Sequence, residues 1–284
     1  MSKPLKSMQG VVGLVGAFGI GTALGWVALR KLAANVVKRE AAPSIYAPRE
    51  TIDLMSSGTM TVYADRRGSG RPLVLFHGVH PGASAAEVKS IFSAYRAKRP
   101  VFAPDLPGFG ASNRHDHLYS AALYTFAMMQ LLVRLTTREL PADVVAYGLS
   151  SEFAARAARD RPDLFNSLTL VAPTGFATAE TRRGPRDLFT PHDADMVYAK
   201  VVVPTLVLHG RSESSFARLE PFLARHARTW RARRLTANGG VPEFEVRGEM
   251  FHAVEDLWSD IAHAHGPVER VSHNGFPHVA LQLR

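Results

Sequence analysis

Short apolar runs alternate with longer helical patterns along most of this chain. Pro72–Phe76 is continuously apolar, which is typical of a strand buried on both faces. The expected strands are residues 59–65, 72–76, 100–103, 142–147, 168–171, 201–208 and 230–235, and the expected helices are residues 85–96, 119–140, 152–159, 214–228 and 247–263. This alternation predicts an α/β fold in which helices cover both faces of a mostly parallel central sheet.

Composition narrows the class of protein. The chain has 284 residues, of which 46% are hydrophobic and 21% charged, and this balance excludes a disordered chain. It has no cysteine, which excludes a disulfide scaffold, a thiolate metal site and a catalytic thiol. The net charge is +9, but residues 1–50 contribute +5 of it through seven bases and two acids. The remaining +4 is small for residues 51–284, so we expect no nucleic-acid partner.

The N-terminal region contains an uncharged apolar segment. Gly10–Leu29 is twenty residues long, which matches the ~30 Å hydrocarbon core of a bilayer. Arg30 and Lys31 follow at once, and Trp26 lies where an interfacial aromatic belongs. The pattern favours an uncleaved membrane anchor over a signal peptide, which would end in a small-residue cleavage site. The alternative is a buried or amphipathic helix, since the many glycines lower helix propensity.

We therefore expect an anchor over residues 1–31, a linker over residues 32–50 and an α/β domain over residues 51–284. Basic residues are slightly more numerous after the apolar segment than before it, which places the globular domain on the cytoplasmic side of the membrane. Gly21 and Gly25 form a GxxxG pair, so a helix-mediated dimer is possible.

The most informative motif follows the expected strand Ala142–Tyr147. The chain continues as Gly148-Leu149-Ser150-Ser151-Glu152 into a helix, and a serine at a strand-to-helix turn with a glycine two residues before it is typical of a nucleophile elbow. The turn would lift the Ser150 hydroxyl clear of the sheet, and the helix N-terminus would offer N–H groups to an oxyanion. The alternative is an ordinary helix-capping serine.

Further motifs strengthen the nucleophile interpretation. His77-Gly78-Val79 follows one apolar strand and Asp105–Ser112 (DLPGFGAS) follows the next, while LVAPTGF and PTLVLHG come later at residues 170–176 and 204–210. In this order the motifs resemble the α/β-hydrolase family over residues 58–260. The resemblance implies a Ser150 nucleophile and an oxyanion hole built from the backbone N–H groups of Val79 and Ser151.

The resemblance also implies an acid just after PTLVLHG, where Glu213 is the candidate. A carboxylate there would orient a catalytic histidine and stabilise its imidazolium form. The segment between residues 173 and 200 is short, so the lid that this family often carries there would be reduced. A serine at the elbow, where related enzymes have aspartate, argues against epoxide hydrolase and dehalogenase chemistry.

Two positions depart from the family pattern. Glu152 replaces the second elbow glycine, so that Ser150–Phe153 resembles an S-x-E-F variant found in some bacterial members. Glu243 stands where the family's histidine is expected, and a carboxylate is a weak base near neutral pH unless burial raises its pKa. His252 and His278 are the remaining candidates for the base.

The leading hypothesis is a membrane-anchored serine hydrolase that acts on an ester-like carbonyl of a small-molecule substrate. Ser150 would attack the carbonyl and water would release the acyl group, with no metal and no organic cofactor. His263 and His265 alone do not make a metal site. The alternative is a catalytically impaired hydrolase-fold protein that lacks the loop histidine and serves as a binding or scaffold module.

Overall fold

The computed structural model describes residues 44–114, 119–176, 194–210, 216–226, 228–236 and 247–265. The chain divides into two units, Met1–Pro43 and Ser44–Arg284, and all the described residues belong to the second. The expected anchor over residues 1–31 therefore lies outside the described residues, as does most of the expected linker. Among the helices that the structure does describe, none is both long enough and apolar enough to cross a membrane.

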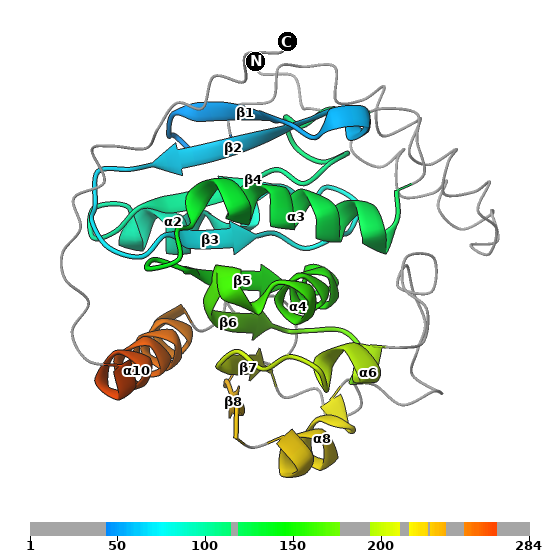
Figure 1. Ribbon diagram of the computed structural model, residues 1–284, viewed down its shortest axis with the longest axis vertical. Coiled ribbons are helices and arrows are strands. Elements are labelled where there is room, and N and C mark those ends of the chain that lie inside the picture. Colours follow the sequence, from blue (N-terminus) through cyan, green and yellow to red (C-terminus); the bar gives the residue numbers. More distant parts are fainter. Residues whose placement is uncertain are drawn as a thin grey trace, which may run out of the picture. The chain divides into compact units, whose positions relative to one another are not determined.

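Eight strands form one sheet (Figure 1). Their bounds are β1 Arg49–Asp53, β2 Thr59–Asp65, β3 Leu73–Phe76, β4 Val101–Pro104, β5 Ala142–Tyr147, β6 Phe165–Val171, β7 Thr205–His209 and β8 Trp230–Arg234. The order across the sheet is β1-β2-β4-β3-β5-β6-β7-β8. Only β1 with β2 and β2 with β4 pair antiparallel, and the other pairs are parallel. The mostly parallel sheet expected from the sequence is confirmed.

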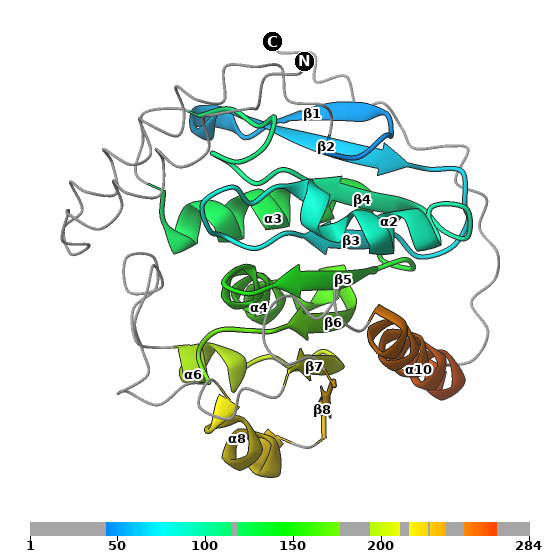
Figure 2. The ribbon, with the colours of Figure 1, turned by 180° about the vertical axis from the view of Figure 1, so that it is seen from behind.

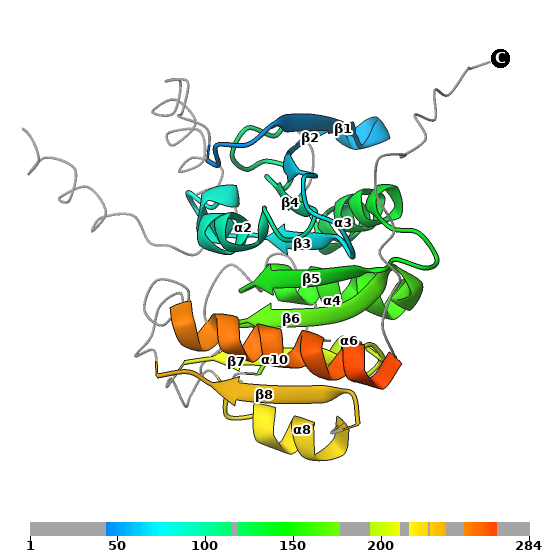
Figure 3. The same cartoon turned by 90° about the vertical axis from the view of Figure 1, so that its left-hand side faces the viewer.

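Helices cover both faces of this sheet (Figures 2 and 3). Their bounds are α2 Lys89–Tyr95, α3 Ala121–Leu135, α4 Ser150–Asp160, α6 Ala194–Tyr198, α8 Leu219–His226 and α10 Arg247–His265, with short 3-10 turns at Met55–Ser57, Ala85–Val88 and Pro162–Leu164. Helices α3, α4, α6 and α8 pack in one apolar cluster, and α2 and α10 pack in the other.

The packing of β3 explains why its sequence is continuously apolar. Val74 and Phe76 pack on the side of α3 and α4, whereas Leu73 and Leu75 pack on the side of α2 and α10. All four side chains are fully buried. A strand covered on both faces has no solvated side, so each of its positions must be apolar.

The structure adds one strand that the sequence did not reveal. Strand β1 (RETID) lies at the edge of the sheet and buries only Ile52, so it carries no apolar run. It begins at Arg49, and Ile45 before it is buried in the core, so both fall within the stretch expected to be a linker. The expected helix over residues 85–96 begins as a 3-10 turn at Ala85–Val88, where the Ser84 side chain accepts a hydrogen bond from the Ala86 N–H.

Candidate active site at the carboxyl edge of the sheet

The turn after β5 is the centre of the candidate site. Strand β5 ends at Tyr147 and α4 begins at Ser150, so Gly148 and Leu149 make the turn. Gly148 has φ +52°, a left-handed conformation that favours glycine. A Cβ atom built on Gly148 would meet no other described atom within 4 Å. We call Gly148 the apex, because it occupies the strained position between strand and helix that carries the nucleophile in an elbow.

Ser150 lies two residues beyond the apex. It is the first residue of α4, it is fully buried, and its Oγ donates a hydrogen bond of 2.6 Å to the backbone oxygen of His77. The sequence analysis expected the turn to lift this hydroxyl clear of the sheet, and the structure corrects that expectation. The hydroxyl points into the protein because the turn that could expose a side chain falls at Gly148.

The backbone N–H groups near the apex differ in their hydrogen bonds. The Ser151 N–H donates to the backbone oxygen of Gly148 at 3.2 Å, so it is occupied within the first turn of the helix. The N–H groups of Val79 and Leu149 have no hydrogen-bond partner among the described residues. Val79 belongs to the loop after β3, which pairs with β5, and Leu149 follows the apex directly. Of these N–H groups, those of Val79 and Leu149 are therefore the ones left available to an acceptor.

His77 positions the loop after β3. Its ring is fully buried, with Nδ1 2.6 Å from the Gly78 oxygen and Nε2 accepting from the Leu106 N–H at 2.9 Å. These partners require a neutral ring with its proton on Nδ1. Burial lowers the pKa of His77 and keeps the ring in that form. With both nitrogens occupied, His77 has no free nitrogen for proton transfer.

Glu87 and His80 hold the same loop from the other side. Glu87 Oε2 accepts from the Gly78 N–H at 2.8 Å, and Oε1 lies 2.5 Å from His80 Nε2. Burial raises the pKa of Glu87, but the hydrogen bonds from His80 and Gly78 more than offset it, so the pKa lies below its ordinary value. The hydrogen bond to Glu87 raises the pKa of His80. The Gly78 N–H is thus occupied.

Asp105 organises the loop after β4. Its carboxylate is fully buried and accepts hydrogen bonds from the N–H groups of Ala85 at 2.7 Å and Ala111 at 2.8 Å. Gly110 has φ +48°, and a Cβ there would lie 2.0 Å from the Asp105 Cγ, so no side chain fits. The D-x-x-G-x-G-x-S motif therefore builds a loop around a buried carboxylate.

Glu152 links α4 to the loop after β6. It is 1% exposed, and its Oε1 accepts a hydrogen bond from Thr174 Oγ1, while the Tyr198 hydroxyl donates to the Thr174 oxygen at 2.9 Å. With the apex at Gly148, the crowded position two residues on is Ser150, which is small. Glu152 lies two residues beyond the crowded position, so its large side chain does not conflict with the packing of the turn.

The candidate bases and acid are not gathered at the apex within the described residues. His252 is exposed on α10, a helix that packs with α2 against one face of the sheet, and no hydrogen bond or ion pair joins it to Ser150 in the described part of the chain. His209 ends β7, where burial lowers its pKa and its ring lies 4.8 Å from that of Phe216. Glu213, Glu243 and His278 lie outside the described residues, as does most of the expected reduced lid.

No cluster of three or more histidine or acidic side chains suited to a metal ion occurs among the described residues. The turn position that sequence reasoning missed is Gly148. The available signal was the strand boundary, because a strand ending at Tyr147 puts the next residue, a glycine that tolerates positive φ, on the turn.

Fold and motif order define an α/β-hydrolase architecture with a modified elbow. The sequence model of the alpha/beta hydrolase fold family matches residues 71–243, which is more than half of the chain. The chain therefore belongs to the α/β-hydrolase fold family.

Solved structures share this fold at low sequence identity. A putative lipase from Acinetobacter baumannii superposes with a TM-score of 0.64 at 14% identity, covering 88% of this chain and all of the other. A meta-cleavage product hydrolase from Pseudomonas fluorescens gives a TM-score of 0.58 at 16% identity, covering 74% of this chain and 97% of the other. At such identities the similarity shows the fold alone.

Curated relatives cover less of the chain. Uncharacterized proteins of Mycobacterium tuberculosis and Mycobacterium bovis are 31% identical over 120 residues, which is 40% of this chain. The chain spans only about a third of the length of these relatives, since the match covers 34% of each.

Proposed function

We propose that this chain is a hydrolase-fold binding protein, which holds a small carbonyl or carboxylate compound at the elbow without cleaving it through an elbow serine. One observation carries the proposal: the apex of the turn after β5 is Gly148, and its φ is +52°. Covalent catalysis at an elbow requires a nucleophilic side chain at the apex, aimed at the substrate, and glycine supplies none.

Ser150 is a poor substitute for an apex nucleophile. Its hydroxyl is fully buried and donates to the His77 backbone oxygen at 2.6 Å, and a backbone carbonyl cannot take up the proton as a catalytic base would. To attack a carbonyl, it would have to break that bond and leave the first turn of α4. A serine also needs a base within hydrogen-bond reach, and in the described part of the chain none touches it.

The N–H groups of Val79 and Leu149 support a retained binding role. They have no partner among the described residues, and a carbonyl or carboxylate oxygen is the acceptor that suits two such donors. The open space beside the Gly148 Cα would receive the ligand atom that a serine oxygen would otherwise contact.

The second candidate function is the serine hydrolase itself, with Ser150 as nucleophile, Glu213 as acid and His252 or His278 as base. The same pair of N–H groups favours it, since an oxyanion hole serves hydrolysis as well as binding. Under this hypothesis the helix would rearrange on substrate binding to expose Ser150.

A serine-directed fluorophosphonate probe separates the two functions. We expect no labelling of the wild-type protein or of Ser150→Ala, and labelling of Gly148→Ser combined with Glu243→His, because these two changes restore a hydroxyl at the apex and an imidazole at the position that resembles the family's base. Gly70→Ser is the matched control, because Gly70 also has positive φ (+99°) and no neighbour within 4 Å of a Cβ, but lies in the turn between β2 and β3. Wild-type labelling that Ser150→Ala abolishes would establish the hydrolase instead.

Membrane anchoring through residues 1–31 is part of the same proposal. It rests on the uncharged run Gly10–Leu29 between basic flanks. We expect full-length protein to sediment with membranes and to require detergent, and a chain lacking residues 1–31 to stay in the supernatant. Full-length protein that is soluble without detergent would refute the anchor.

A further inference from the structure

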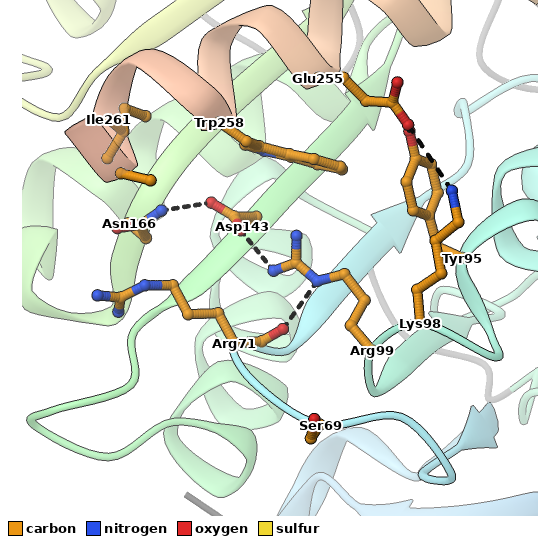
Figure 4. A pocket seen from close by; sticks show the side chains of 11 residues that line it. Ser69, Arg71, Tyr95, Lys98, Arg99, Asp143, Asn166, Glu255, Trp258 and Ile261 are labelled. Atoms are coloured by element: carbon orange, nitrogen blue, oxygen red, sulfur yellow. Dashed lines mark hydrogen bonds and ion pairs between the residues drawn. The ribbon is translucent and has the colours of Figure 1, made fainter. Parts of the chain in front are cut away.

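A cleft lies where β5 and β6 begin, which is the end of the parallel strands opposite the elbow. Figure 4 shows the side chains that line it. Its volume is about 410 Å³, and its wall comes from the residues before β3, the first residues of β5 and β6, the segment after α2 and the C-terminal half of α10. This volume falls in the range of small-molecule sites. Three cations, Arg71, Lys98 and Arg99, line it against two acids, Asp143 and Glu255. The lining thus has a net charge of +1.

Asp143 neutralises Arg99. The Arg99 Nη2 lies 2.5 Å from Asp143 Oδ2, and the Arg99 Nε donates to the Arg71 backbone oxygen at 2.9 Å. The Trp258 ring covers the Arg99 guanidinium, whose central carbon is 4.8 Å from the ring centroid. Arg99 is therefore fixed on three sides, and its charge is satisfied within the protein.

Asp143 has little capacity to neutralise a second cation. The residue is 2% exposed, and its other oxygen accepts from Asn166 Nδ2 at 2.7 Å and from Ser167 Oγ at 2.6 Å. Glu255 is engaged elsewhere, since it accepts from the Tyr95 hydroxyl at 2.9 Å and lies 4.0 Å from Lys98. Each acid of the cleft thus already has its own cation.

Arg71 forms no ion pair among the described residues. The only hydrogen bond that its side chain makes there is from Nη1 to the Glu139 backbone oxygen at 3.3 Å. In Figure 4 its guanidinium extends away from the Arg99–Asp143 pair. Burial lowers the pKa of Arg71, which Asp143 partly opposes and Arg99 reinforces. A partly buried cation beside a second cation gains from a bound anion.

We propose that this cleft binds the carboxylate or phosphate group of a small organic anion, with Arg71 as its principal partner. Arg71 presents the planar donor fork that matches either group, and the pairing of Arg99 with Asp143 leaves Arg71 as the cation that faces the ligand. The site is independent of the function proposed for the elbow, because the two lie at opposite ends of the parallel strands.

Calorimetric titration of the full-length protein at low salt tests the site, with inorganic phosphate in one arm and succinate in the other. We expect at least one of them to bind with a dissociation constant of about 1 mM or tighter, and Arg71→Gln to weaken that binding about tenfold. The arm with the tighter binding identifies the preferred group. Tryptophan fluorescence gives a second readout, since Trp258 lines the cleft.

Arg134→Gln is the matched control. Arg134 is exposed on α3 and also donates a single 3.3 Å hydrogen bond to a backbone oxygen, that of Asp53, so its loss changes the net charge equally but outside the cleft. The Arg134→Gln variant should bind the anion with the affinity of the wild type. Arg71→Lys keeps the charge but not the fork and should bind with intermediate affinity, and it replaces Arg71→Gln as the deciding variant if circular dichroism shows the latter unfolded.

The proposal fails if neither anion binds at concentrations up to about 20 mM. It also fails if the folded Arg71 variant binds as tightly as Arg134→Gln, because the anion would then lie elsewhere. Fluorophosphonate labelling of the same preparations reports on the elbow separately, so the two proposals cannot be confused.

Discussion

The polar groups at the two ends of the parallel strands differ in how well they are satisfied. We call the end where the strands begin the amino edge and the end where they finish the carboxyl edge. At the carboxyl edge, the fold uses the side chains of two family motifs, since Ser150 donates to the His77 oxygen and Asp105 holds the loop after β4. Glu87 beside them accepts from the Gly78 N–H. At the amino edge, where the family motifs predict nothing, Arg71 forms no ion pair among the described residues. The motif side chains at the carboxyl edge are therefore hydrogen-bonded within the protein, and the amino edge carries the less satisfied charge.

The largest expected effect is at the amino edge. Asp143→Ala removes the buried partner of Arg99 and two further hydrogen bonds, so unfolding free energy should fall by about 3–5 kcal/mol. Asp256→Ala, which breaks an exposed 3.1 Å pair with Arg233, should cost less than about 1 kcal/mol. Urea denaturation compares them, and equal losses would mean that the Arg99–Asp143 pair is no more important than a surface pair.

The next effect is at the carboxyl edge. Gly110→Ala should destabilise the protein by about 3 kcal/mol, because the added Cβ would lie 2.0 Å from the Asp105 Cγ in a backbone of positive φ. Gly82→Ala is the control, since its φ is +84° but a Cβ meets nothing within 4 Å, and it should cost only about 1 kcal/mol. The difference in thermal midpoint isolates the clash with Asp105. Equal shifts of the thermal midpoint in the two variants would mean that Asp105 does not organise this loop.

A smaller effect tests whether Ser150 is structural. Ser150→Ala deletes one buried hydrogen bond to the His77 oxygen and should lower the free energy of unfolding by about 1 kcal/mol. Ser151→Ala, which deletes a 3.1 Å bond to the Ala146 oxygen, should behave similarly. A Ser150→Ala protein of unchanged or increased stability would indicate a functional hydroxyl held at a cost to the fold.

The smallest effect depends on pH. The raised pKa of His80 makes its contribution present below about pH 6.5 and lost as pH rises through the folded pKa, while the lowered pKa of Glu87 makes its contribution present above about pH 4.5. His80→Gln should therefore destabilise most near pH 5.5, by less than about 1 kcal/mol because His80 is half-exposed. Denaturation at about pH 5.5 and 8.5 checks this, and a pH-independent loss would contradict the pairing.

Local patterns predicted the sheet well, because each buried strand carries its own apolar signature. Strands β2 and β5 have the bounds expected for them, and β1 was missed because an edge strand needs only Ile52 to be apolar. The positive-φ turn after β5 lies at Gly148, two residues before the serine that the sequence analysis put on the turn. Gly148 reads as the first glycine of G-x-S in the sequence, and only the boundary at Tyr147 shows that it is itself the turn.

The amino-edge cleft could not be predicted in the same way. Its residues are brought together by sheet pairing and helix docking rather than by spacing, as with the hydrogen bond between Tyr95 and Glu255, 160 residues apart. Neither Arg71 nor Trp258 belongs to a motif. Asp143 forms an ion pair with Arg99 and not with Arg71, and this choice of partner is a property of the folded sheet.

Helix α10 has a consequence for the order in which the protein is made. It supplies Met250, Ala253, Val254 and Leu257 to the apolar cluster that also holds Leu73, Leu75 and Val145. During synthesis those strands leave the ribosome long before residue 247 does, so the part of this face that α2 does not cover stays exposed until α10 is made. The nascent chain would need protection by a chaperone through that interval, and a message truncated before α10 would yield an aggregating product with half a cleft.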